Sequence, residues 1–142
     1  MASYSRAGPT DPPRVSILSE GAYLIASIHT ALDDSQLQQF QSDLIECVRR
    51  DRARGVIIDV AALDVLDSFG AHTLGNIAAM AKLRGAITVI VGISPELAIT
   101  IVQLGMPLDR VPTALRLDDG LAVLDRLTRG GADAAVARRR SG

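Results

Sequence analysis

The chain has 142 residues, of which 15 are basic and 16 acidic, and its formal net charge is −1. This length predicts a single domain, and the charge balance excludes the basic field that nucleic-acid binding requires. The composition is 48% hydrophobic but only 3% aromatic, so we expect an aliphatic core.

Disulfide-stapled and membrane proteins are also excluded. Cys47 is the only cysteine, which rules out an intramolecular disulfide. The N-terminus has no apolar signal-peptide core, and no apolar run is long enough to cross a bilayer. We therefore expect a cytoplasmic protein without membrane contact.

The first part of the chain predicts a hairpin followed by a helix. Residues 1–13 contain three prolines and read as a flexible segment. Residues 15–19 and 22–28 are strand candidates on either side of a turn. Asp33 is the expected cap of a helix that ends at Gly55. The apolar stripe of this helix is formed by Leu37, Phe40, Leu44, Ile45 and Val48.

Residues 55–84 form the stretch around which the rest is arranged. Residues 56–58 are Val-Ile-Ile, the pattern of a strand buried on both faces. Apolar residues then recur at helical spacing from Ala71 to Ala81. Either Asp67 or Ser68 can cap this helix. A helix N-terminus also tolerates added negative charge, so Ser68 could accept a phosphate, although spacing alone favours an ordinary cap.

The last part predicts two more strands and two more helices. Residues 86–93 form a buried strand, and Ser94 caps a helix that stops at Gly105. A short extended piece at residues 112–117 precedes Asp118, the expected cap of a helix that ends at Gly130. Residues 129–142 are expected to be a disordered tail, which leaves residues 14–128 as the domain. The order β-β-α-β-α-β-α-β-α predicts an α/β fold with a mixed, mostly parallel sheet and crossover helices.

Motifs for catalysis are missing from the sequence. It contains no phosphate-binding loop, no dinucleotide fingerprint, no zinc-protease motif and no nucleophile elbow, so we expect no cofactor, no metal and no enzyme activity. Ser68 and His72 lie one helical turn apart, but nothing supplies an orienting group for such a pair. A weaker alternative is a small phosphotransfer enzyme that holds Mg²⁺ through Asp59, Asp64 and Asp67.

Several blocks, in the right order, are similar to one known family. They are G-V-I-I-D at residues 55–59, A-L-D-V-L-D-S-F-G at 62–70, K-L-R-G-A at 82–86 and I-S-P-E-L-A-I-T-I-V-Q-L-G at 93–105. From about residue 13 to residue 127 the chain resembles the STAS domains of bacterial anti-sigma-factor antagonists. Within that family it resembles the RsbS-type scaffold proteins of the stressosome.

This resemblance implies a phosphorylation switch in a stress-response pathway. Ser68 would be phosphorylated by an RsbT-like serine kinase and dephosphorylated by an RsbX-like phosphatase. The unphosphorylated protein, in a homo-oligomer or in a hetero-oligomer with RsbR-like paralogues, would sequester the kinase. The partner-binding residues would be Asp64, Asp67, Ser68, Phe69 and Gly70. Thr100 matches a second phosphorylation site of RsbR-type relatives.

The subfamily stays open at this stage. D-S-F-G at residues 67–70 is partly similar to single-domain SpoIIAA-type antagonists, and Ala71-His72 looks more like RsbR-type sequences. The alternative within the family is therefore an antagonist that binds an anti-sigma-factor kinase directly.

Overall fold

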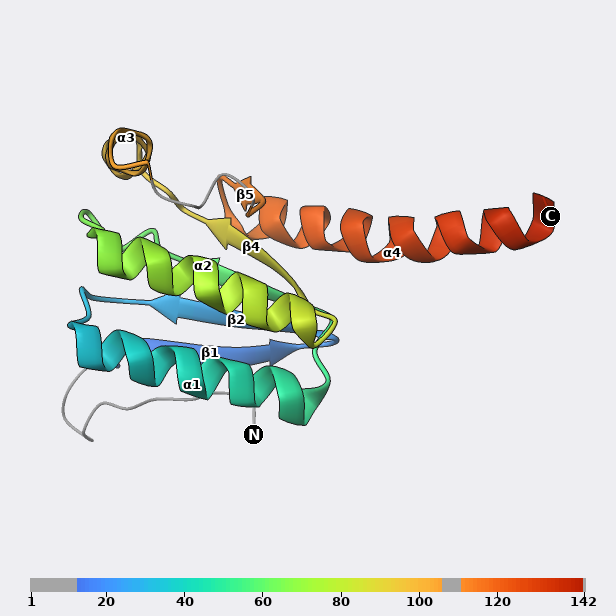
Figure 1. Ribbon diagram of the computed structural model, residues 1–142, viewed down its shortest axis with the longest axis horizontal. Helices are drawn as coiled ribbons and strands as arrows, with labels where there is room; N and C mark the ends of the chain where they lie inside the picture. Colours follow the sequence, from blue (N-terminus) through green and yellow to red (C-terminus); the bar gives the residue numbers. More distant parts are fainter. Residues whose placement is uncertain (1–12, 106–110, 142) are drawn as a thin grey trace.

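The computed structural model describes residues 13–105 and 111–141, with side chains described as far as Arg129 (Figure 1). Most of the expected N-terminal segment, residues 1–12, lies outside the described residues. The elements follow the predicted order. They are β1 (Val15–Glu20), β2 (Tyr23–Ile28), α1 (Asp34–Asp51), β3 (Gly55–Asp59), α2 (Ser68–Leu83), β4 (Ile87–Val91), α3 (Pro95–Gln103), β5 (Thr113–Ala114) and α4 (Leu117–Ser141).

The strands form one five-stranded sheet in the order β1-β2-β3-β4-β5. β1 pairs with β2 antiparallel, and the remaining neighbours pair in parallel. Gly21 makes the predicted hairpin turn with a φ of 59°, a value that glycine adopts without strain. The predicted fold class, a mixed and mostly parallel sheet with crossover helices, is confirmed.

Helices cover both faces of the sheet, but unevenly. α1 and α2 lie side by side on one face, where the larger core cluster forms (Figure 1). α4 packs on β3, β4 and β5 of the other face, where Leu124 is fully buried against Ile57 and Val89. On that second face Leu18 of β1, which lies opposite Ile25 of β2, remains 43% exposed. β3 is therefore buried on both faces, as its apolar run predicted, whereas β1 is not.

The sequence predicted that Gly55 ends α1, and this prediction is wrong. The helix ends at Asp51, and Arg52 follows as its C-cap in the left-handed region with a φ of 50°. Gly55 is instead the first residue of β3, where a Cβ atom would lie 2.9 Å from the methyl groups of Leu124. This glycine allows α4 to approach the sheet closely.

The predicted limits of α4 are also wrong. The helix begins at Leu117, so Asp118 lies in its first turn and is not its cap. It continues through Gly130 to Ser141, where a disordered tail was expected. Alanine and arginine dominate residues 132–140, and their high helix propensity compensates for the glycines.

Candidate functional site

The loop from β3 to α2 is attached firmly to the end of the sheet. The Val60 amide donates to the Val91 carbonyl at 3.0 Å, and the Ala61 amide donates to the Asp59 carboxylate at 2.9 Å. Gly92 adopts a φ of +84°, and a Cβ atom there would lie 2.8 Å from the Ala61 nitrogen. The first residues of the loop are thus held against β4 by hydrogen bonds and by a close backbone approach.

Asp67, not Ser68, caps α2. Its carboxylate accepts a hydrogen bond from the Gly70 amide at 2.7 Å, while Ser68 is the first helical residue. The structure thereby decides between the two caps that the sequence left open. Ser68 is exposed, and its hydroxyl has no hydrogen-bond partner among the described residues. The hydroxyl is therefore accessible and has no structural task in the described part of the chain.

The five predicted partner-binding residues are consecutive or nearly so, but they differ in exposure. Asp64, Asp67 and Ser68 are exposed, and Phe69 is half-buried. Gly70 is buried, and a Cβ atom there would lie 2.6 Å from a methyl carbon of Leu66. Gly70 therefore shapes the site through its backbone, whereas the first three present side chains to solvent.

Val65 was missed by the sequence reasoning. It lies between Asp64 and Leu66 and is 75% exposed, whereas Leu66 is buried. A pair of neighbouring apolar residues in a loop does not reveal which of them faces solvent. The signal that could have singled it out is its position inside the acidic segment D-V-L-D.

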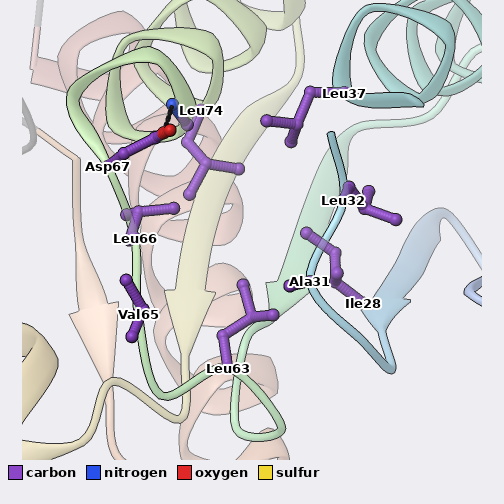
Figure 2. Close-up of a pocket in the computed structure, with 10 residues that line it drawn as sticks. Ile28, Ala31, Leu32, Leu37, Leu63, Val65, Leu66, Asp67 and Leu74 are labelled. Atoms are coloured by element: carbon purple, nitrogen blue, oxygen red, sulfur yellow. Dashed lines mark hydrogen bonds between the residues drawn. The ribbon is translucent and has the colours of Figure 1, made fainter. Parts of the chain in front are cut away.

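A pocket of about 160 Å³ lies beside the N-terminus of α2 (Figure 2). One wall comes from the β3–α2 loop and the first half of α2, and the other from the end of β2, the loop after it and α1. Its lining is almost entirely apolar, with the Asp67 carboxylate at the edge. The lining residues are Ile28, Ala31, Leu32, Leu37, Leu63, Val65, Leu66, Asp67, Gly70 and Leu74. Sequence patterns did not indicate this pocket, because it combines separate segments.

Thr100, the second predicted phosphorylation site, lies on α3 rather than in this loop. Its side chain is half-buried, and its hydroxyl donates to the Glu96 carbonyl at 3.1 Å. The hydroxyl of Thr100 is thus already engaged within its own helix, unlike that of Ser68.

The magnesium alternative gains no support from the geometry. Among residues 13–105 and 111–129 no group of three or more His, Cys, Asp or Glu side chains could hold a metal ion. Asp59 and Asp67 instead accept backbone hydrogen bonds in the loop.

No helix within the described residues has the length and apolarity to cross a membrane. Burial raises the pKa of the Cys47 thiol, which lies in the core, so this cysteine is a poor nucleophile.

Comparison with known proteins identifies the domain family of the chain. The STAS domain model matches residues 15–120. RsbRA of Bacillus subtilis, described as an RsbT co-antagonist protein, is 31% identical over 97 residues, which are 68% of this chain and 35% of that protein. RsbRD of the same organism is 33% identical over 67 residues, which are 47% of this chain and 24% of that protein. The chain thus spans about a third or less of the length of these curated relatives.

Similar solved structures match a larger part of this chain than the two curated relatives do. A serine-to-glutamate variant of RsbS from Moorella thermoacetica is 37% identical, with a TM-score of 0.73 over 82% of this chain and 98% of that one. A chain in a structure described as the molecular architecture of the stressosome is 36% identical, with a TM-score of 0.70 over 80% and 98%. The chain therefore belongs to the STAS-domain family and, as its sequence predicted, is similar to the RsbS-type proteins of the stressosome.

Proposed function

We propose that the chain is a phosphorylation-switched scaffold that binds and sequesters an RsbT-like serine kinase until Ser68 is phosphorylated. The observation that carries this proposal is the exposure of Ser68 and its freedom from the role of helix cap. Its hydroxyl is exposed at the first position of α2, and the neighbouring Asp67 already caps the helix. Phosphorylation would therefore leave the cap in place, so that the domain stays folded while its surface changes.

The negative charge of a phosphate on Ser68 would weaken the docking of the kinase. A phosphate adds about −1.5 to −2 charges at neutral pH. At Ser68 it would join the exposed carboxylates of Asp64 and Asp67 on the same short segment. The positive end of the α2 dipole stabilises such a group in the folded domain. A kinase surface that docks on the unmodified loop would instead meet repulsion or lose apolar contact with the exposed Val65.

The remaining parts of the proposal follow from the family. RsbR-like paralogues would assemble with this chain in the cytoplasm, and an RsbX-like phosphatase would reset Ser68. The chain itself would act by binding, without catalysis. The similarity to RsbS and to a stressosome chain supports this over a SpoIIAA-type antagonist that binds an anti-sigma-factor kinase directly.

The test uses the full chain, an RsbT-like kinase and ATP. Wild type, Ser68→Ala and Ser68→Asp are compared by intact mass and by kinase pull-down. Ser42→Asp, which adds the same charge at an exposed position on α1, is the matched control. We expect one phosphate on wild type and none on Ser68→Ala. Kinase should be retained by wild type and Ser42→Asp but released by Ser68→Asp.

Two results would overturn this proposal. One is phosphorylation of Ser68→Ala to the same extent as wild type, and Thr100→Ala would then identify whether α3 is the target. The other is equal retention of the kinase by Ser68→Asp and Ser42→Asp. Size separates the two antagonist readings, because a scaffold should form a large particle when mixed with RsbR-like paralogues, whereas a direct antagonist should not.

A further inference from the structure

The pocket beside Ser68 combines an apolar interior with an acidic surround. Leucine and isoleucine side chains form most of its lining, and Figure 2 shows these side chains on both sides of the opening. Asp64 and Asp67 are exposed on the loop that forms one wall, and Asp33 and Asp34 are exposed at the start of α1. A side chain that enters this pocket should therefore be aliphatic and should have basic neighbours.

The other end of α2 presents such a side chain. Leu83, the last residue of the helix, is 88% exposed. It stands between Lys82 and Arg84, both exposed. Further arginines gather around this end, where a surface depression is lined by Arg49, Arg52, Arg54 and Arg84. The helix thus carries an aliphatic side chain within a basic surface at one end and lies beside an apolar pocket within an acidic surface at the other.

No chain can place its own Leu83 in its own pocket. Leu83 is the last residue of α2, whereas the pocket takes Gly70 and Leu74 from the first half of the same helix. The helix has 16 residues and at 1.5 Å per residue is about 24 Å long, so its two ends are held apart. An occupant with the chemistry of Leu83 must therefore come from another molecule, and a second copy of this chain offers it.

We propose that the pocket of one copy receives Leu83 of a second copy, so that the acidic end of one α2 meets the basic end of the next. The contact joins two different surfaces, the pocket of one copy and the Leu83 end of α2 of the other. It goes beyond the kinase switch, but it uses Val65 and Asp67 of the proposed kinase-binding loop, so a second copy and the kinase would compete for this surface. Since Ser68 adjoins the pocket, a phosphate there adds charge that attracts Lys82 and Arg84 of the second copy.

Cysteine cross-linking tests this contact in the full chain. In a Cys47→Ala background, one copy carries Ala31→Cys in the pocket and another carries Leu83→Cys, both at exposed positions. Oxidised glutathione serves as the oxidant. We expect the mixture to form a disulfide-linked dimer roughly tenfold faster than either variant alone, because docking raises the local thiol concentration. The control mixture replaces Leu83→Cys with Leu104→Cys, a 57% exposed position at the end of α3.

Charge reversal separates docking from random collision. Adding Lys82→Glu and Arg84→Glu to the Leu83→Cys copy should slow cross-linking to the control rate, and high salt should slow it in the same direction. Equal rates for the Leu83→Cys and Leu104→Cys mixtures would overturn the proposal.

A second measurement needs no new cysteine. Sedimentation velocity at high protein concentration should show self-association that Leu83→Asp and Ala31→Trp both abolish, with Leu104→Asp as the control. Self-association unaffected by Leu83→Asp would overturn the proposal. So would loss of kinase binding in Ala31→Trp without any self-association of wild type, which would assign the pocket to the kinase.

Discussion

Replacement of Gly92 by alanine tests how firmly the site loop is held. Gly92 has a φ of +84°, and a Cβ atom there would lie 2.8 Å from both the nitrogen and the Cβ of Ala61. Gly85 has the same φ of +84°, but a Cβ atom there would meet nothing within 4 Å. The two glycines share a φ value and differ in available space, so Gly85→Ala is a matched control.

The magnitude follows from two separate costs. An L-residue in the left-handed region loses about 1–2 kcal/mol of stability, which applies to both variants. Forcing an extra methyl group into an occupied space costs about 1–3 kcal/mol more, and this applies at Gly92 alone, because the Ala61 backbone must move. Gly92→Ala should therefore lower the free energy of unfolding by about 2–5 kcal/mol.

Urea unfolding followed by circular dichroism measures both variants under one set of conditions. We expect the difference between the two losses to be about 1–3 kcal/mol, the steric part alone. If Gly92→Ala and Gly85→Ala lose the same stability, the close approach of Gly92 to Ala61 does not hold the loop, and the argument for a fixed site is refuted.

Three other perturbations test the site and its supports. Asp67→Ala removes the cap of α2 and should lower the free energy of unfolding by about 1 kcal/mol, whereas Asp64→Ala, at an exposed position, should change it by less than about 0.5 kcal/mol; equal losses would contradict the cap. Tyr23→Phe removes a hydroxyl that donates to a carboxylate of α4 at 2.6 Å, and should cost about 1 kcal/mol; an unchanged urea midpoint would show that this bond does not attach the helix. The hydrogen bond from Arg49 lowers the pKa of Glu46, so the stabilisation it gives is present above the unfolded pKa and is lost as pH falls through the folded one. Arg49→Ala should raise the pKa of Glu46 measured by NMR towards its ordinary value, and an unchanged pKa would contradict the pairing.

Strands and caps were predictable because their signals are local. The Val-Ile-Ile run at residues 56–58 identified a strand buried on both faces, and β3 is that strand. Ser94 followed by Pro95 identified the start of α3 to the residue. Each signal depends on side chains within one turn or one strand, so neighbouring residues sufficed.

Features set by distant segments were not predictable in the same way. Gly55 read as a helix stop, but its small size is needed because Leu124 packs against it from α4. The sequence left Asp67 and Ser68 equal as caps, because both side chains can accept the same backbone donor. The pocket was missed because its lining residues come from the end of β2, the loops after β2 and β3, α1 and α2, which meet only in the folded domain.

Because helices cover the sheet unevenly, its strands should differ in how fast their amide hydrogens exchange with solvent. β3 lies between helices on both faces, whereas β1 is an edge strand with Leu18 partly in solvent. Amide hydrogens of β1 should therefore exchange with solvent through small local openings, while those of β3 should wait for global unfolding. The loop that presents Ser68, the proposed phosphorylation site, follows directly from β3, so it is attached to a strand whose amides should exchange slowly. An enzyme that modifies Ser68 would then bind a preformed loop surface. Local openings at the β1 edge would leave this surface unchanged.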